Sequence, residues 1–507
     1  MTNDQRPNRR PRCGRARFIF GPRETGGVIL GLRAAQLGAL VAGLSLLVAG
    51  LSRGRTGAVA GLVMLAGAAA FAFVGVGGRS ADQWAPVLAA HALQRLRGQH
   101  VFRGGPAAAD RAAVRRGPAL DLPGVLANLT LLAVPVEGGR AVGVVKDPQR
   151  HTYSAVVAVR GATFALLEAG ERTRRVAAWG ALLAGLAREG SPVCRLQWVE
   201  RTVPDTGNAL QRYWQEAGRH DDGDRPLSAA AASYAELIAA AAPVTQSHET
   251  YLALAIDARR ARRAVGQAGG GDRGGCGVLL RELAAMQEQL ARAQLDVVGW
   301  LPPRGLAAVL RTAFEPGNQR TIERRDSVAD AESGVDPGVA GPVAAEAAWG
   351  HYRTDDGWHA TYWVHEWPRM EVGADFLAPL LLQTTCRRTV ALVAEPVSPR
   401  KAARQVTTAS TSELTNQSMR DRVGQVTTER QRTEAADVRR RERELVAGHG
   451  QYRFIAYITV TGTTSDELEE ACGQVEQAAH QSLLEIRRLH GEQDQAFAFS
   501  LPLCRGL

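Results

Sequence analysis

The sequence predicts a mixed α+β protein: an N-terminal transmembrane helical hairpin followed by two split βαβ-type lobes, with a long helical arm in the second lobe. Three observations support this fold class. Two uncharged apolar runs stand close together near the N-terminus. The remainder alternates short β-branched segments with segments of helical periodicity. A long polar stretch with almost no proline interrupts the last third of the chain.

The two apolar runs have the composition of membrane-spanning helices. Residues 57–76 contain no charge and no proline, and about 20 helical residues cross a hydrocarbon layer of about 30 Å. Residues 37–51 are also uncharged, and they reach spanning length with the preceding turn from Val28, which includes Arg33 and Gln36. A buried helical hairpin inside a soluble core is the alternative.

The short connection between the runs predicts how the helices meet. Only residues 52–56 separate them, so the helices are expected to be antiparallel neighbours. Gly57 and Gly61 form a small-xxx-small step, which lets two backbones approach closely. Long basic and indole side chains near the hairpin ends are expected to reach the headgroups. The residues predicted at this membrane interface are Arg23, Arg33, Arg79 and Trp84.

The distribution of arginine predicts the topology. Residues 1–116 contain 17 arginines and four acidic residues, a net charge of +13, whereas the whole chain carries +10. The body is therefore slightly acidic, which argues against direct nucleic-acid binding by it. Because basic flanks stay in the cytoplasm and meet anionic lipid, we expect a multi-pass protein of the cell membrane with both termini cytoplasmic. The turn that holds Arg53 and Arg55 would lie outside.

Composition shifts divide the chain into units. Residues 81–97 carry an apolar helical stripe, which fits either an interfacial helix or a helix packed on the body. Residues after Phe314 lose aromatic character and gain proline and glycine. The expected units are a basic cytoplasmic tail (1–27), the transmembrane hairpin (28–78), a basic amphipathic juxtamembrane region (79–118), a first α+β lobe (119–314), a flexible linker (315–345) and a second α+β lobe (346–507) with a helical arm at about 398–446.

Both lobes are expected to repeat an order of paired strands, helix, strand and helix. Strands are expected where β-branched residues cluster or alternate, and helices where apolar residues recur every three or four positions. The expected strands are 129–137, 141–146, 152–160, 194–201, 248–256, 297–301, 358–365, 388–396 and 451–461. The expected helices are 174–188, 276–294, 302–314 and 465–484, besides the polar arm.

The sequence contains no catalytic motif that we recognise. Six scattered cysteines form no CxxC pair, which excludes a zinc knuckle or thioredoxin-type site. A P-loop needs a lysine between glycine and a hydroxyl residue, and neither Lys146 nor Lys401 has that context. No GxSxG or HExxH motif occurs. We therefore expect no catalytic residue, no cofactor and no bound metal.

Several segments carry a resemblance to known families. The hairpin with its basic helix resembles the small two-helix inner-membrane subunit of type IV secretion systems. The body resembles the N-terminal, non-ATPase domain of the large assembly ATPase of those systems. The opening segment is similar to a family of actinobacterial integral membrane proteins encoded with conjugative elements. The segments that carry the resemblance are 20–27, 31–33, 122–124, 143–147, 452–461, 466–483 and 491–502.

The resemblance implies a non-catalytic, membrane-anchored structural subunit of a conjugation or type IV secretion-like translocation machine. A separate cytoplasmic P-loop ATPase would dock on the second lobe and its arm, and other channel subunits would be further partners. The alternative is an uncharacterised membrane-bound enzyme that uses the His/Trp-rich region 349–367, where three histidines lie among four tryptophans.

Overall fold

The protein is built around one large antiparallel β-sheet covered by helices, which confirms the mixed α+β class. The structure is a computed structural model. It describes residues 18–21, 34–73, 75–104, 120–136, 141–161, 167–204, 229–241, 246–326, 333–423 and 429–507. Arg23 and Arg33 of the predicted membrane interface lie outside these residues.

Thirteen of the described strands belong to the large sheet, and all their pairings are antiparallel. The strands are β3 (Val101–Arg103), β4 (Thr130–Pro135), β5 (Ala141–Asp147), β6 (Thr152–Arg160), β7 (Val193–Pro204), β8 (Gln246–Asp257), β9 (Asp296–Trp300), β10 (Ala344–Ala347), β11 (Tyr352–Thr354), β12 (Trp358–Glu366), β13 (Arg387–Val397), β14 (Gln451–Gly462) and β15 (Glu485–Arg488). A separate two-stranded sheet joins β1 (Gly75–Val76) to β2 (Arg79–Ser80).

The two halves of the sheet have the same pairing pattern. In the first half, β6 and β7 both pair with β8, β9 pairs with β6, and β4 and β5 extend the edge. In the second half, β12 and β13 both pair with β14, β15 pairs with β12, and β10 and β11 extend the opposite edge. Pairing of β7 with β13 joins the halves into one sheet.

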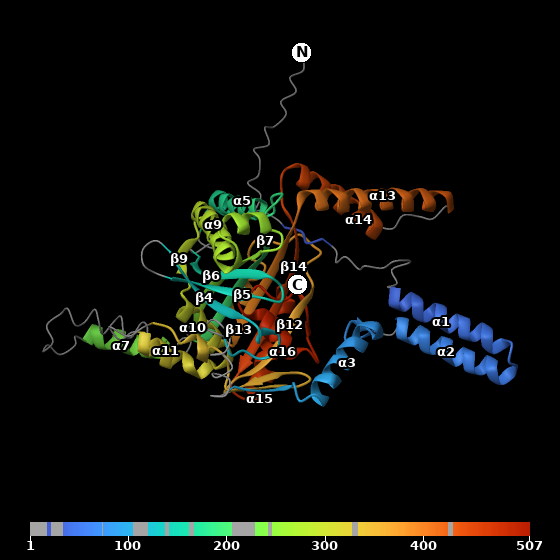
Figure 1. Ribbon diagram of the computed structural model, residues 1–507, viewed down its shortest axis with the longest axis horizontal. Helices are drawn as coiled ribbons and strands as arrows, with labels where there is room; N and C mark the ends of the chain where they lie inside the picture. The colour runs from blue at the N-terminus through green and yellow to red at the C-terminus, as the bar shows by residue number, and fades with distance from the viewer. Residues whose placement is uncertain are drawn as a thin grey trace, which may run out of the picture.

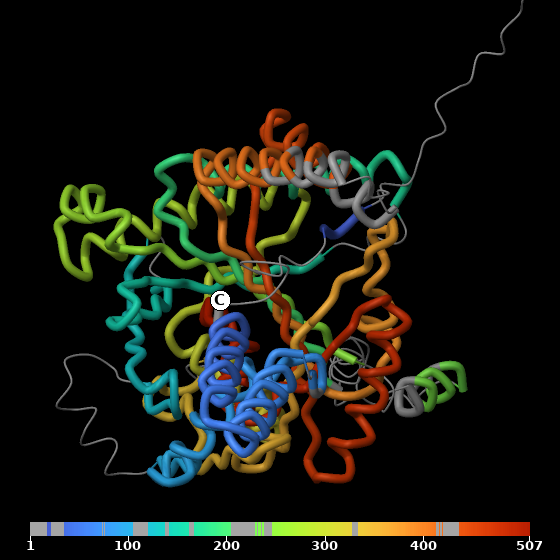
Figure 2. The backbone as a smooth tube through the Cα atoms, turned by 90° about the vertical axis from the view of Figure 1, so that its right-hand side faces the viewer, coloured from blue at the N-terminus to red at the C-terminus, as the bar shows by residue number. Residues whose placement is uncertain are grey.

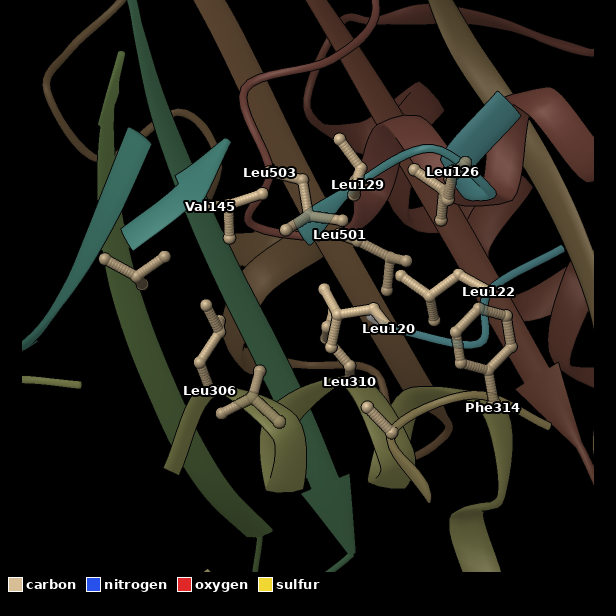
Figure 3. Close-up of a cluster of buried hydrophobic side chains, with 14 of the residues drawn as sticks. Leu120, Leu122, Leu126, Leu129, Val145, Leu306, Leu310, Phe314, Leu501 and Leu503 are labelled. Carbon is tan, nitrogen blue, oxygen red and sulfur yellow. The ribbon is translucent and has the colours of Figure 1, made fainter. Parts of the chain in front are cut away.

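Helices cover both faces of this sheet (Figure 1). On one face, α5 (Ala169–Leu186) and α9 (Gly271–Arg292) cover the first half, and α12 (Ala378–Leu382) and α15 (Ser465–Gln481) cover the second. On the other face, α10 (Pro303–Phe314) and α16 (Gln493–Ser500) pack with the residues that follow Leu120 (Figure 3). The other helices in the described part of the body are α7 (Ala229–Ala241), α8 (Arg262–Gln267), α11 (Gln319–Asp326), α13 (Pro399–Val423) and α14 (Glu429–Val446).

The described part of the predicted flexible linker 315–345 is ordered and joined to the core, so that expectation is corrected. Pro316 and Pro337 each open a short 3-10 helix, since a fixed proline φ suits the first position of a helical turn. Val335 and Ala340 are buried in the same apolar cluster as α10. Many prolines and glycines therefore mark tight turns in this segment.

The last residues of the chain join the two halves of the sheet. The Gln197 amide on β7 donates to the carbonyls of Phe499 (3.0 Å) and Leu501 (2.9 Å) and accepts from the Cys504 amide (2.6 Å). The Tyr457 hydroxyl on β14 donates to the Gly506 carbonyl. The C-terminal segment is thereby held over the β7–β13 boundary.

A buried ion pair also joins the C-terminal segment to β5, near the outer edge of the first half of the sheet. Arg505 and Asp147 of β5 approach within 2.7 Å, and both side chains are almost fully buried. Breaking one partner of such a pair leaves an uncompensated buried charge, so the contact specifies where the segment lies.

Replacement of Gln197 tests whether its hydrogen bonds to the C-terminal segment stabilise the fold. Gln197→Leu is close in side-chain volume but removes three hydrogen bonds to the backbone of the C-terminal segment, so the free energy of unfolding should fall by about 3 kcal/mol. The Leu501 carbonyl keeps a second donor, the Leu503 amide, whereas the Cys504 amide loses its partner. Gln481→Leu, on the exposed end of α15, is the matched control and should change it by less than about 0.5 kcal/mol. Denaturant unfolding of the detergent-solubilised protein measures both. Equal stability of the two variants would contradict the role.

Candidate functional site

Two apolar helices stand outside the body of the protein. They are α1 (Ala34–Leu51) and α2 (Arg55–Phe73). Figures 1 and 2 show them side by side, and Figure 1 shows that they lie away from the large sheet. Ten of their large apolar side chains remain between 47% and 68% exposed. A contiguous exposed patch of this kind marks a membrane or partner surface. The exposed side chains are Val41, Leu44, Leu46, Val48, Leu51, Val59, Leu62, Val63, Met64 and Phe73.

Length and composition distinguish the two helices. Within the described residues, α2 is the one helix that is long and apolar enough to cross a membrane, while α1 is apolar but shorter. The preceding turn, from which the sequence predicts the start of the first span, lies outside the described residues. The structure therefore contains one candidate membrane-spanning helix, α2, which fits association with a membrane.

The two helices meet through glycines, as the sequence spacing predicts. A Cβ added at Gly57 would lie 2.5 Å from the Gly50 carbonyl oxygen, and one added at Gly61 would lie 2.6 Å from the Leu47 Cα. Gly43 and Gly50 supply the opposite side of this contact. The seven-residue spacing of those two glycines is a sequence signal that we did not use.

A polar side chain holds the base of the helix pair. Gln36 on α1 is buried, and its amide donates to the Ala72 carbonyl at the end of α2 (3.1 Å) and to the Asp82 carboxylate (3.2 Å). Asp82 lies in the first turn of α3 (Ala81–Leu96), the predicted amphipathic helix. Gln36 therefore joins three helices, and sequence reasoning treated it only as a polar interruption.

The structure places Arg79 and Trp84 in contact with the body. The Arg79 guanidinium pairs with the Glu492 carboxylate at 2.8 Å and lies 5.3 Å from the Trp84 ring centroid. Trp84 stacks on Trp349 at 5.9 Å between ring centroids. Of the two alternatives for 81–97, packing on the body is observed at Trp84, whereas Leu88, Leu93 and Leu96 of the same helix remain between 46% and 85% exposed. Periodicity alone does not distinguish these alternatives, because lipid and protein both accept an apolar face.

The His/Trp-rich region 349–367 lies mostly in β11, β12 and their turns. His359 is fully buried between two hydroxyls, 2.8 Å from Thr354 Oγ1 and 2.9 Å from Thr461 Oγ1. Burial, reinforced by the nearby Arg387, lowers the pKa of His359 to about 3. The imidazole is therefore neutral, with both ring nitrogens engaged. Among the described residues, no three His, Cys, Asp or Glu side chains are grouped as a metal site would require.

The first of the two lysines is engaged in a structural contact. Lys146 Nζ, on β5, lies 2.9 Å from a carboxylate oxygen of Asp272, in the first turn of α9. The Tyr153 hydroxyl donates to the other oxygen of the same carboxylate at 2.8 Å. An acidic side chain thus occupies the positive end of α9, where it is favoured by the helix dipole.

Comparison with known proteins adds no family to these observations. We found no match to this chain among protein-family models or curated proteins. The functional interpretation therefore rests on the helix pair, the contacts at its base and the architecture of the sheet.

The glycine contact gives a prediction for the helix pair. Gly61→Ala should destabilise it by about 1–3 kcal/mol, because the added methyl group overlaps the α1 backbone. Gly67→Ala is the matched control on the same helix, with nothing within 4 Å of the added Cβ. It should leave the pair unchanged or stabilise it by up to about 1 kcal/mol. Thermal unfolding in detergent micelles compares the two, and equal melting temperatures would refute the close contact.

The buried imidazole gives a pH prediction. An unfolded histidine has a pKa of about 6.5, above the folded value of about 3, so the unfolded chain takes up a proton first as the pH falls. The contribution of the neutral His359 side chain to the free energy of unfolding is therefore complete above about pH 6.5 and is lost as the pH falls towards 3. Between about pH 7.5 and 5.5, wild type should lose about 1.4 kcal/mol more than His359→Gln. His480→Gln, at an exposed site, should follow wild type, and parallel pH profiles for all three would overturn the assignment.

Proposed function

We propose that this chain is a non-catalytic, membrane-anchored structural subunit of a conjugation or type IV secretion-like translocation machine, which holds a separate cytoplasmic P-loop ATPase at the membrane. The observation that carries this proposal is the exposed apolar helix pair outside the folded body. The resemblance of the sequence to secretion subunits gives the proposal its class of machine and its partner.

The membrane part of the proposal follows from the energetics of the helix pair. Ten large apolar side chains of α1 and α2 remain about half exposed or more. Moving each of them from water into hydrocarbon contributes on the order of 1 kcal/mol, or about 10 kcal/mol in total. Glu, Asp and Lys are absent from α1 and α2, and Arg55 stands at the first position of α2. Both helices cross the bilayer as a hairpin, with the body and both termini in the cytoplasm.

The sheet supports a body of two related lobes. In the first half, β6 and β7 run parallel on either side of β8 and are joined through α5. In the second half, β12 and β13 flank β14 in the same way and are joined through α12. Each half is a split βαβ unit, and the body is a fused pair of them.

The arm formed by α13 and α14 is the proposed docking surface for the ATPase. It leaves the sheet between β13 and β14, and its two helices lie against each other beyond the body (Figure 1). Of α13, Ala402 and Val406 are buried at the base, whereas Thr407 and Thr408 are already exposed. A long polar helix pair that supplies little core is suited to binding another protein.

The alternative of an enzyme built on residues 349–367 receives no support from the contacts of that region. His359 is engaged at both ring nitrogens by threonine hydroxyls. His351 lies against the Trp358 ring at 4.8 Å between centroids, and His365 lies against Trp363 at 5.2 Å.

Two deletions test the two parts of the function separately. Removal of residues 34–73 should move the protein from carbonate-washed membranes into the soluble fraction. Replacement of residues 408–436 by a short Gly/Ser linker retains the buried base of the arm. This second variant should stay in the membrane and lose at least about 90% of the P-loop ATPase that co-purifies with the full chain, since the partner surface is gone. Quantitative mass spectrometry of both preparations gives the readout.

The outcomes that would overturn the proposal are distinct. A full-length chain found in the soluble fraction would exclude the membrane anchor. Full retention of the ATPase by the arm variant would exclude the arm as its docking surface. A full-length chain that captures no P-loop ATPase under mild cross-linking would exclude the proposed partner.

A further inference from the structure

The chain upstream of the helix pair is held by the body. The Phe18 amide donates to the Val372 carbonyl at 2.9 Å, and the Val372 amide donates back to the Phe18 carbonyl at 3.0 Å. This reciprocal pair is the hydrogen-bonded unit of an antiparallel ladder. It attaches a segment that precedes α1 to the loop between β12 and α12, in the second half of the sheet.

An aromatic cluster reinforces this attachment. Phe20 stacks on Trp367 with 4.9 Å between ring centroids, and it lies 5.5 Å from Phe376 and 6.3 Å from Phe454. We call the latter three residues the aromatic cup. Each such ring pair contributes about 0.5–1.5 kcal/mol beyond burial. Trp367 and Phe376 lie in the loop between β12 and α12, and Phe454 lies on β14, so one side chain of the tail contacts two segments of the body.

Gly21, which follows Phe20, lies close to the base of the arm. A Cβ added at Gly21 would lie 3.3 Å from Nη2 of Arg441, on α14. Phe454 of the cup belongs to β14, the strand that follows α14. The tail therefore contacts the place where the arm returns to the sheet.

The chain downstream of the helix pair is held by the same half of the body. Arg79 pairs with Glu492, and Trp84 stacks on Trp349. Gln94, near the end of α3, donates to the Asp494 carboxylate at 2.8 Å. Both flanks of the helix pair are thus fixed to the second half of the sheet, the upstream flank through the cup and the downstream flank through α3.

We infer that residues 18–21 form a clasp, and that the clasp requires the chain between Phe20 and Arg79 to cross the membrane an even number of times. A folded body lies on one side of a bilayer, so both attached flanks lie on that side. If α2 crosses, α1 must cross as well, although α1 is the shorter apolar helix. The crossing part of this inference rests on the proposed membrane function, whereas the clasp does not.

The clasp is tested by a disulfide between its two strands. Hydrogen-bonded antiparallel partners have Cα atoms about 5.5 Å apart, within the range that a disulfide spans. Phe18→Cys with Val372→Cys, in a Cys13→Ser chain, should cross-link within one molecule when isolated membranes are oxidised. The other cysteines are buried or half-buried. Adding Phe20→Ala should slow cross-linking at least about fivefold, whereas adding Ile19→Ala, at an exposed side chain, should not.

The crossing is tested in the same chain by cysteine labelling between the helices. Ser52→Cys is preferred to Gly54→Cys, because Gly54 has a φ of 88°, which a side chain disfavours. An impermeant maleimide should label position 52 in intact cells. Labelling confined to broken cells, with the protein in the membrane and the clasp cross-linked, would overturn the two crossings.

The two parts of the inference fail in different ways. A soluble protein that still cross-links would overturn the membrane function and the crossings and leave the clasp intact. No cross-link in a membrane-bound chain, or a cross-link only between two chains, would overturn the clasp within one molecule. An equal effect of Phe20→Ala and Ile19→Ala on cross-linking would overturn the role of the cup.

Discussion

Pairing between β7 and β13 is the constraint on which the remaining architecture depends. Seven residue pairs, from Thr202–Arg388 to Leu196–Ala394, merge the two halves into one sheet. This pairing creates the surface over which the C-terminal segment lies, because Gln197 and Tyr457 hold that segment from either half. It also brings α10 and α16 into one apolar cluster, in which Phe314 contacts Phe497. The layer that contains α10 and α16 therefore depends on the joined sheet.

Local patterns predicted the elements with strong periodicity. Residues 152–160 form β6 and residues 451–461 fall within β14, since β-branched and alternating residues fit a pleated, half-buried surface. Residues 276–294 fall mostly within α9, whose apolar face is buried. Pairing across long separations carries no such local signal. The β3–β10 contact and the β7–β13 junction each join segments about 200 residues or more apart and were not predicted.

In the candidate site, too, local patterns could be predicted from the sequence, whereas contacts between distant segments could not. Gly57 and Gly61 could be assigned to a helix contact because their spacing places them on one face of a helix. Arg79 and Trp84 were assigned to lipid because an amphipathic pattern reports polarity and not the identity of the neighbour. Their partners Glu492 and Trp349 lie hundreds of residues away. The contacts of the tail residue Phe20 were not predicted, since its aromatic partners come from the loop between β12 and α12 and from β14.

The way the arm is inserted has a mechanical consequence. Ser398 alone separates the end of β13 from the start of α13, and four residues separate α14 from β14. The arm is therefore a lever whose fulcrum is a pair of central strands, and a torque on its tip is delivered to the backbone hydrogen bonds of β13 and β14. Since β13 is also the strand that meets β7, rotation of the lever would load the junction between the halves in shear. A force applied to the arm would thus act on the pairing that joins the two halves.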